Sequence, residues 1–416
     1  MPHQSKKIPN PSPEPEAPIQ PASAEAASGS AEEELAQEER RRKRLLLLLL
    51  LLLLLLCCVC VLFYQYLKRP APLPEIVPVV NINYPPHYLF SIYGVDKPVG
   101  VALSPDGERI YVAETGGDRL VKTFDRIGNP LFSFSPPNTS AGMRSPVYVA
   151  VDKSGRVFVT DRLQNSILVY DADGNYLDTI LSPTLGLNQY IASQIGEMPE
   201  GTVFYYNVFE QKAHYTLSGR EDQTLPPPQT PAWDPLGVRF DPQGNLWLTD
   251  VGGENHTVRK FEARDLAIWP TLFFTPAQIA FGSTGQGNGE FLFPNVVVTD
   301  SQGRIYVTDG NNGRVSAWDA QGNYLFEFGR GTGEGAFSLP RGAFMDERDR
   351  LHIVDAVGQN VKVYDVSGPQ PAFLFVFGDW GLGDGLFNYP NDIALDQTGR
   401  LYIADRENNR IQVWSY

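Results

Sequence analysis

Residues 390–416 read PNDIALDQTGRLYIADRENNRIQVWSY and form one unit of a repeat that occurs several times upstream. The earlier copies continue past the aromatic residue that corresponds to Trp414 into a turn and one further short apolar strand. A matching stretch, Tyr88-Leu-Phe-Ser-Ile-Tyr-Gly94, lies at the other end of the repeats. If the repeats close into a ring, residues 88–94 complete the last unit and no strand edge is left unpaired. The sequence therefore predicts a β-propeller.

Each unit predicts a blade of four antiparallel strands. Three linkers share the pattern G-x-G-x-G-x-F-x-x-P, at residues 285–294, 331–340 and 381–390. After the proline come a short apolar run, a turn that ends in glycine, a second strand that ends in an acid, and a third strand that ends in an aromatic residue. Alternating apolar residues with Asp/Gly turns between them are typical of antiparallel hairpins. Because the glycines precede a strand rather than a helix, they do not fit a dinucleotide-binding loop.

The number of blades depends on one irregular unit near residues 190–225. First strands are expected to begin at Pro98, Pro146, Tyr190, Pro235, Pro294, Pro340 and Pro390, about 44 to 59 residues apart. If the irregular unit counts as a blade, the ring has seven blades; if it is an insertion, the ring has six. The spacing favours seven, because about 330 residues over seven units give an ordinary blade length.

The linkers, the second strand Ile305-Tyr-Val-Thr-Asp309, and the turns Asp309-Gly-Asn-Asn-Gly-Arg314 and Asp405-Arg-Glu-Asn-Asn-Arg410 resemble NHL repeats. The resemblance extends over about residues 88–416. It implies a propeller that binds protein, peptide, nucleic acid or glycan. It also implies a ring of six blades, which is usual for that family and one fewer than the spacing favours.

A membrane-spanning helix is predicted before the propeller. Residues 45–56 are an unbroken run of leucines, and the apolar stretch continues to residue 67, so about 23 residues rise roughly 35 Å. A cleaved signal peptide is the alternative, but the apolar run is long for one and no small-x-small cleavage site follows. Five cations at residues 40–44 precede the apolar stretch, whereas only Lys68 and Arg69 follow it. This bias predicts a single-pass protein in the cell membrane with a cytoplasmic N-terminus and the propeller outside.

The expected organisation has four parts. Residues 1–39 are rich in Pro, Ala, Ser and Glu and predict a disordered cytoplasmic tail. Residues 40–67 are the basic flank and the transmembrane helix, and residues 68–83 form a Pro-rich stalk. Residues 84–416 form the propeller.

Charge and cysteine content limit the possible functions of the propeller. Residues 45–416 contain 40 acidic and 27 basic residues, a net charge of −13. An acidic propeller is a poor electrostatic match for nucleic acid, which leaves protein, peptide or glycan as the expected ligand. The three cysteines all lie within residues 57–60, so the propeller has no disulfide framework and no thiol nucleophile.

The acid at the end of each second strand has two interpretations. Converging carboxylates and amides at the central channel could hold Ca²⁺. The favoured interpretation is that each acid caps the following turn, because it occurs once per blade at the same position. These acids are Glu114, Asp161, Asp250, Asp309, Asp355 and Asp405. The propeller histidines His87, His214, His256 and His352 fall at unrelated positions, which argues against a shared zinc ion.

We expect the propeller to be a non-enzymatic binding or sensor module without a cofactor. We call the face where first strands begin and second strands end the top face. The alternative is a metal-dependent hydrolase or lyase that resembles the lactonase or amidating-lyase propellers, with Ca²⁺ as its candidate metal. The candidate ligand contacts are polar or aromatic residues of the top-face turns and strand starts: Arg162, Gln164, Asn311, Asn312, Arg341, Trp380, Asn391, Asp392, Arg406 and Asn408.

Overall fold

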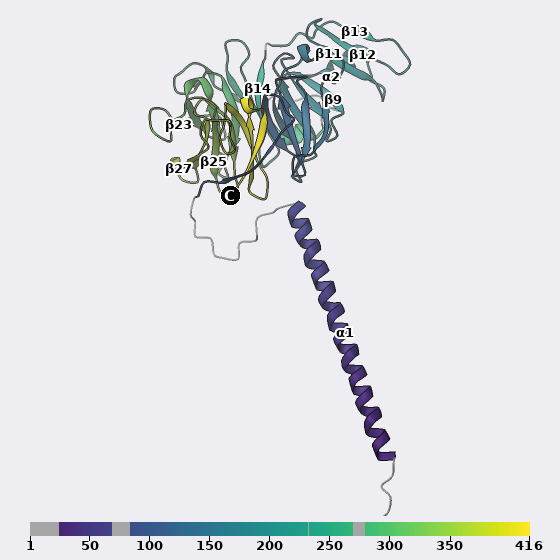
Figure 1. Ribbon diagram of the computed structural model, residues 1–416. Helices are drawn as coiled ribbons and strands as arrows, with labels where there is room; N and C mark the ends of the chain where they lie inside the picture. The colour runs from purple at the N-terminus through teal and green to yellow at the C-terminus, as the bar shows by residue number, and fades with distance from the viewer. Residues whose placement is uncertain (1–24, 69–83, 232, 269–278) are drawn as a thin grey trace, which may run out of the picture. The chain divides into compact units, whose positions relative to one another are not determined.

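The computed structural model describes residues 25–68, 84–231, 233–268 and 279–416. The polypeptide divides into two units, Met1–Pro70 and Ala71–Tyr416, and each is described by itself. Figure 1 labels their helices and strands.

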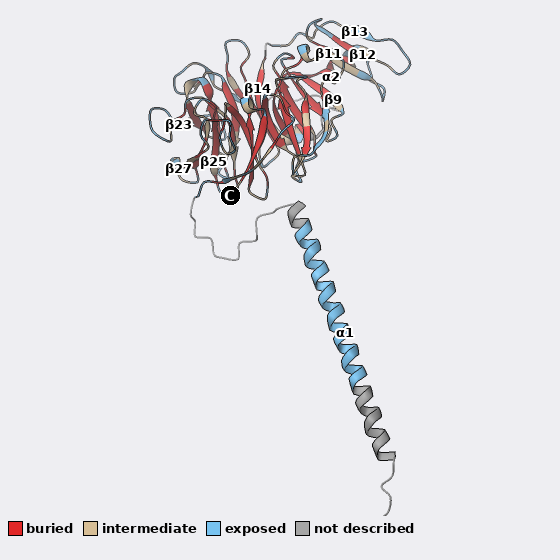
Figure 2. Cartoon of the chain, in the orientation of Figure 1, coloured by how far each residue is buried: buried red, intermediate tan, exposed pale blue. Residues whose placement is uncertain are grey.

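The first unit is the helix α1 (Glu25–Lys68). Within its segment Glu38–Tyr64, a window of 18 residues has a mean hydropathy of 3.6, and the segment is long and apolar enough to cross a membrane. Its leucines are exposed, as Figure 2 shows. A signal sequence near an N-terminus has the same length and composition, so this helix is a candidate for either a membrane anchor or a signal sequence. The helix starts at Glu25, inside the segment that the sequence predicts to be disordered. The remaining tail, residues 1–24, and most of the predicted stalk, residues 69–83, lie outside the described residues.

The second unit is a ring of six antiparallel sheets. Each first strand contacts the next, and the last contacts the first, so the ring closes. We number the blades 1 to 6 in sequence order. Their first strands are β2 (Pro98–Leu103), β6 (Pro146–Val151), β14 (Pro235–Phe240), β20 (Pro294–Thr299), β24 (Pro340–Met345) and β28 (Pro390–Leu395).

The second, third and fourth strands of each blade follow the order that the repeat predicts. The second strands are β3 (Arg109–Glu114), β7 (Val157–Asp161), β15 (Leu246–Asp250), β21 (Ile305–Asp309), β25 (Arg350–Asp355) and β29 (Arg400–Asp405). The third strands are β4 (Val121–Asp125), β8 (Ser166–Tyr170), β16 (Thr257–Phe261), β22 (Arg314–Trp318), β26 (Asn360–Asp365) and β30 (Arg410–Ser415). The fourth strands are β5 (Pro130–Phe134), β9 (Tyr176–Ser182), β17 (Ile279–Phe281), β23 (Tyr324–Phe328), β27 (Ala372–Phe377) and, in blade 6, β1 (His87–Ile92).

Several short elements lie outside the four-stranded pattern. The strand β10 (Leu185–Gly186) extends blade 2, and β18 (Ser283–Thr284) pairs with β19 (Glu290–Phe291) in a linker. The helix α3 (Ala263–Ile268) follows β16. The 3-10 turns are η1 (Ala141–Met143), η2 (Gly310–Asn312) and η3 (Arg406–Asn408).

The prediction of seven blades is wrong, because β6 contacts β14 directly and leaves no place between them for another blade. The intervening segment is an insertion that holds α2 (Leu187–Ile195) and a separate sheet of β11 (Val203–Asn207), β12 (Lys212–Thr216) and β13 (Gln223–Leu225). Figure 1 shows this sheet beside α2 and β9. The residues around Tyr190, expected to start a first strand, form α2. The buried Asp178 of β9 accepts a hydrogen bond from the Asn188 N–H at the start of this helix, at 3.0 Å, and burial raises the pKa of Asp178 to about 7.

Close packing between first strands also favours an even number of blades. The third residue of the first strand is glycine in blades 1, 3 and 5, at Gly100, Gly237 and Gly342. A Cβ on Gly237 would fall on the backbone carbonyl of Asn295 in blade 4, and the other two glycines meet the next blade in the same way. Blades 2, 4 and 6 carry larger residues there. This alternation is continuous around a ring of six and would be broken in a ring of seven.

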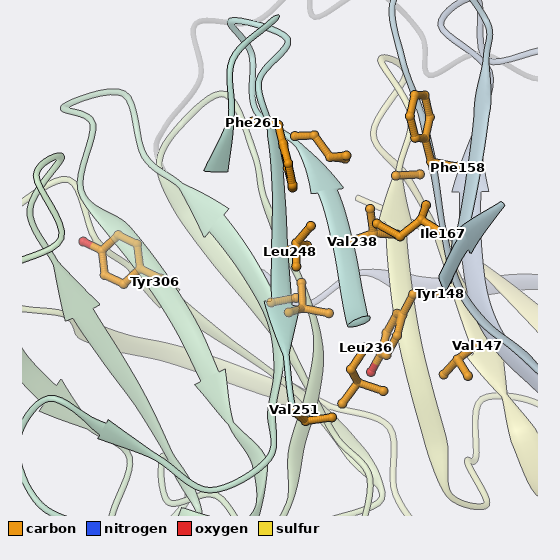
Figure 3. Packing of buried hydrophobic residues seen from close by; sticks show 14 of the residues in the cluster. Val147, Tyr148, Phe158, Ile167, Leu236, Val238, Leu248, Val251, Phe261 and Tyr306 are labelled. Carbon is orange, nitrogen blue, oxygen red and sulfur yellow. The ribbon is translucent and has the colours of Figure 1, made fainter. Parts of the chain in front are cut away.

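Apolar side chains pack between neighbouring blades, and Figure 2 shows that most of the blade strands are buried. In the largest cluster, Val147 and Tyr148 of blade 2 pack with Leu236 and Val238 of blade 3 (Figure 3). Each blade thus buries both faces of its sheet, which explains the near-continuous apolar runs of the inner strands.

The ring is closed by the strand pair that the sequence predicts. β1 is antiparallel to β30, with Tyr88 opposite Trp414 and Ile92 opposite Ile411. The Tyr88 and Trp414 rings lie edge to face, with their centroids 6.0 Å apart. Ile92 is only 2% exposed and belongs to the core between blades 6 and 1. The prediction that the first strand completes the last blade is confirmed.

We expect the closing strand to stabilise the whole propeller. Ile92→Ala should lower the free energy of unfolding by about 2–5 kcal/mol, because it removes buried methyl groups and leaves a cavity. Urea denaturation of the full-length protein in an uncharged detergent measures the change. Leu89→Ala is the matched control, because Leu89 lies in the same strand and is 37% exposed. Equal effects of the two substitutions would contradict a special role for the inward face of this strand.

Candidate functional site

The acids at the ends of the second strands hold the linkers in place. Asp161 accepts hydrogen bonds from the backbone N–H groups of Ser145, Leu163 and Gln164, at 2.9–3.0 Å. Asp309 and Asp405 accept from a linker N–H and from an arginine of the third strand, Arg314 or Arg410. Burial raises the pKa of Asp161 to about 6 and raises that of Asp309. These contacts fit the turn-capping role that the sequence favours.

An ion pair crosses the central channel. Arg239 at the end of β14 in blade 3 pairs with Asp392 of β28 in blade 6, on the opposite side of the ring. The other Asp392 oxygen accepts the Val101 N–H of blade 1, at 3.0 Å. Arg239 also donates to the Val149 carbonyl of blade 2, at 3.3 Å. Burial raises the pKa of Asp392, and the Arg239 charge opposes this shift. One guanidinium and its carboxylate thus connect four of the six blades.

A second layer of polar side chains lines the channel near the starts of the first strands. The hydroxyl of Tyr148 and a guanidinium nitrogen of Arg341 each lie 3.4 Å from the Asn295 side-chain oxygen. The Asn391 amide donates to the Val99 carbonyl of blade 1, at 2.8 Å. Burial raises the pKa of Tyr148 well above its usual range. The channel is therefore occupied by its own side chains at these levels.

Half of the predicted ligand contacts are engaged within the protein. Asn391 and Asp392 are buried in the channel network. Gln164 is 5% exposed and donates to the Met143 carbonyl, at 2.6 Å. Asn312 and Asn408 each bridge a linker carbonyl and the acid at the end of the second strand, at 2.7–2.9 Å. The hydrogen bonds of these five side chains hold the turns, the linkers and the channel in place.

The other five predicted contacts remain accessible in part or in full. Trp380 is 67% exposed, and Asn311 is exposed at η2. Arg162 pairs with Asp234, at 3.0 Å. Arg341 and Arg406 flank the ring of Tyr389, which the sequence prediction missed. These residues come from turns, a linker and the start of β24 on the top face.

The top face also exposes large apolar side chains. They come from turns after second strands, at Leu163 and Val357, and from linkers, at Phe293, Trp380 and Leu382. The corresponding linker positions of blades 4 and 5 carry Thr284, Gln286, Arg330 and Thr332 in place of the last two. The repeat therefore does not require apolar residues there, and their exposure marks this face as a candidate interaction surface.

Two residues of this region could have been found from the sequence only by comparing blades, and a third could not have been found. Arg239 is a charged residue in an otherwise apolar first strand, and Tyr148 is a large residue where alternate blades carry glycine. Tyr389 precedes the first-strand proline and adopts a positive φ of 57°. That conformation is rare for an aromatic residue and is not visible in the sequence.

The bottom face contains two neighbouring hollows, of about 420 and 320 Å³. Arg239, Phe240 and Phe344 line both. The larger one is walled mainly by the apolar ends of first strands, such as Val101 and Ile393. Arg239 therefore lies between the polar channel network and this apolar hollow.

The described residues contain no group of three or more His, Cys, Asp or Glu side chains that could hold a metal ion. Their histidines serve separate contacts. His352 is buried and bonds the Tyr416 hydroxyl, at 2.6 Å. His214 lies between Asp222 and Glu210 in the insertion, and His256 faces the Phe293 N–H, at 3.2 Å.

NHL repeats are present in three of the six blades. Residues 233–261, 291–318 and 387–414 match the family profile of the NHL repeat. These segments cover the first three strands of blades 3, 4 and 6. The prediction of an NHL-repeat propeller is thereby confirmed.

Two curated proteins are similar to parts of this protein. NHL repeat-containing protein 3 of Mus musculus is 29% identical over 228 residues, which are 49% of this chain and 62% of the mouse protein. A probable peptidyl-alpha-hydroxyglycine alpha-amidating lyase of Caenorhabditis elegans is 31% identical over 99 residues, 24% of this chain and 26% of the nematode protein. The similarity thus spans less than two thirds of the length of either relative.

Solved structures with a similar fold are more distant. A streptogramin B lyase has a TM-score of 0.49 and 11% identity, and covers 79% of this chain and 98% of its own. A catalytically inactive virginiamycin B lyase from Staphylococcus aureus has a TM-score of 0.48 with the same identity and coverage. Both TM-scores are below 0.5, so neither similarity assigns a property to this protein.

We expect the channel ion pair to be strongly coupled. Arg239→Met should lower the free energy of unfolding by about 3–5 kcal/mol at neutral pH, because Asp392 is left buried without its cation. The double variant Arg239→Met/Asp392→Leu should recover much of this loss. Since a protonated Asp392 needs no cation, the cost of Arg239→Met should shrink as the pH falls through the raised pKa of Asp392.

Urea denaturation of the wild type, the two single variants and the double variant at two pH values measures this coupling. Arg348→Met is the control, because Arg348 is exposed in the turn after β24 and should change stability by less than about 0.5 kcal/mol. Additive effects of the two channel substitutions would refute the pairing.

Proposed function

We propose that this NHL-repeat propeller is a membrane-anchored, non-enzymatic binding module. Its top face would capture a protein, peptide or glycan outside the cell. The observation that carries the proposal is the exposure of apolar and cationic side chains on top-face turns that the repeat itself does not require. The rigid ring beneath them holds these side chains in fixed positions at little entropic cost on binding.

The channel supports a binding role over a catalytic one. The carboxylate of Asp392, one of the predicted ligand contacts, already pairs with Arg239 and accepts a hydrogen bond from the Val101 N–H. The amide of Asn391 is bonded to the Val99 carbonyl. A metal ion at this level would have to displace a guanidinium and break bonds between blades.

The proposed orientation rests on the charges that flank the apolar segment of α1. Five consecutive cations, residues 40–44, precede this segment, whereas Lys68 and Arg69 follow it. Cytoplasmic flanks carry such an excess of Lys and Arg. We therefore place the N-terminus in the cytoplasm and the propeller on the outer side of the cell membrane, anchored through residues 45–67.

One experiment tests both the binding face and the orientation. Intact cells that display the full-length protein are treated with a membrane-impermeant cross-linker, and the captured partner is quantified. Trp380→Ala combined with Leu382→Ala should reduce capture at least about tenfold, because exposed aromatic anchors dominate binding energy at interfaces. Leu325→Ala is the control, because Leu325 is 44% exposed on the outer strand β23.

Two results would refute the proposal. Capture that is unchanged by the Trp380 and Leu382 substitutions would exclude this face. Cross-linking that requires permeabilised cells would reverse the orientation.

The second candidate function is a metal-dependent lyase, favoured by the 31% identity with the nematode amidating lyase over 99 residues. Under our proposal, Ca²⁺ or Zn²⁺ should leave the melting temperature of the full-length protein unchanged. A lyase-type channel site would instead stabilise the protein by about 2.7 kcal/mol at a metal concentration one hundred times the Kd. A rise in melting temperature that Asn391→Ala or Asp392→Asn abolishes would favour the lyase.

A further inference from the structure

Arg341, Tyr389 and Arg406 form a cluster at the top of the channel, which we call the mouth cluster. Arg341 is the second residue of β24 in blade 5. Tyr389 precedes Pro390 of blade 6, and Arg406 starts the turn after β29 in the same blade. The guanidinium carbons lie 5.9 Å (Arg341) and 5.5 Å (Arg406) from the centre of the Tyr389 ring. Two cations thus share one aromatic ring across a blade boundary.

The backbone holds Tyr389 in this position against its own preference. Its φ is 57°, and its N–H donates to the Gln359 side chain of blade 5, at 2.6 Å. A non-glycine residue in this conformation costs on the order of 1–3 kcal/mol. Lys97 and Phe293 adopt the same conformation before the first-strand prolines of blades 1 and 4, so the repeat imposes it. The hydroxyl of Tyr389 in turn lies 3.4 Å from an Arg341 nitrogen. Local strain therefore helps to position a ring and a guanidinium together.

The two arginines of the mouth cluster lack some of the hydrogen bonds that their guanidinium groups can make. The buried Nε atoms of Arg341 and of Arg406 have no hydrogen-bond partner among the described residues. Arg341 makes two 3.4 Å contacts to neutral oxygens, from Asn295 and Tyr389. Arg406 reaches one carboxylate oxygen of its neighbour Glu407, at 3.4 Å.

Other arginines of the same repeat make more hydrogen bonds through their guanidinium groups. Arg314 and Arg410 each donate their Nε–H to a buried aspartate, at 2.8 Å, and donate further to linker carbonyls. A guanidinium that is partly removed from water needs a comparable acceptor. In the mouth cluster, the Nε–H groups of Arg341 and Arg406 have no such acceptor among the described residues.

We infer that the mouth cluster binds a carboxylate of the ligand, presented by an acidic side group or by the free C-terminus of a peptide. This inference rests on the proposed function and assigns a chemical class to the ligand. The planar fork of a guanidinium matches the two oxygens of a carboxylate. The net charge of −13 on residues 45–416 repels a doubly charged phosphate more strongly than a single carboxylate. Tyr389 offers its ring to the carbon atoms beside the carboxylate.

The test uses the full-length protein in an uncharged detergent and measures equilibrium binding of four probes. They are a capped hexapeptide of five glutamines and one glutamate, the capped hexaglutamine analogue, an N-acetylated glutamine peptide with a free C-terminus, and inorganic phosphate. We expect a carboxylate probe to bind and the capped hexaglutamine not to bind. Arg341→Gln or Arg406→Gln should each weaken that binding at least about tenfold, because a charge-assisted hydrogen bond is lost.

The matched control is Arg348→Gln, which removes the same charge from the turn after β24, where Arg348 is exposed. It should leave binding unchanged, and melting curves of all variants should report any loss of fold. Binding of the capped peptide with one glutamate assigns the carboxylate to an acidic residue, and binding of the free C-terminus alone assigns it to a peptide end. The inference is overturned if no carboxylate probe binds, if phosphate binds more tightly, or if Arg348→Gln weakens binding as much as Arg341→Gln.

A failure of the carboxylate inference can be distinguished from a failure of the proposed function. If Arg341→Gln leaves the cross-linked partner unchanged while Trp380→Ala with Leu382→Ala removes it, the top face binds but the carboxylate assignment fails. If neither variant changes capture, the binding face itself is wrong.

Discussion

The pairing of β1 with β30 is the constraint on which the rest of the propeller depends. It joins residues from the two ends of the domain and gives blade 6 its fourth strand. Once the ring is closed, each first strand must fit between two neighbours. Glycine in alternate blades allows this fit, because a Cβ at Gly237 would occupy the position of the Asn295 carbonyl. Closure and alternation together fix six blades and bring the first strands close to the axis.

The closeness of the first strands determines what the channel can do. Arg239 and Asp392 can form an ion pair across the ring only because opposite blades approach within the reach of one arginine. Their pair, with Tyr148, Asn295 and Asn391, places polar side chains across the axis, next to the larger hollow that first-strand residues of five blades line. The accessible chemistry is therefore displaced to the two faces, with the exposed apolar and cationic residues on the top and the apolar hollows on the bottom.

The repeat separates structural positions from variable ones. Asp309, Asn312 and Arg314 form one bonded set, and Asp405, Asn408 and Arg410 form the same set two blades on. Such residues are polar and lie on the top face, yet their hydrogen bonds hold the linkers. Residues that break the repeat, such as Trp380 and Leu382, are exposed instead. Departure from the repeat is consequently a better guide to a binding surface in this protein than polarity.

The sequence alone determined the propeller, the strand order within blades, the closing strand and the apolar helix, because these follow from local periodicity, turn residues and matching repeat units. It also identified the acids at the ends of the second strands as turn-capping residues, because an acid recurs at the same position of each repeat. The tertiary structure decided the blade count, because only the direct contact of β6 with β14 shows that the segment between blades 2 and 3 is an insertion. It alone showed the partner of Asp392 and the strained Tyr389 between two arginines. Contacts between opposite or adjacent blades join residues far apart in the sequence, and no local pattern encodes such distances.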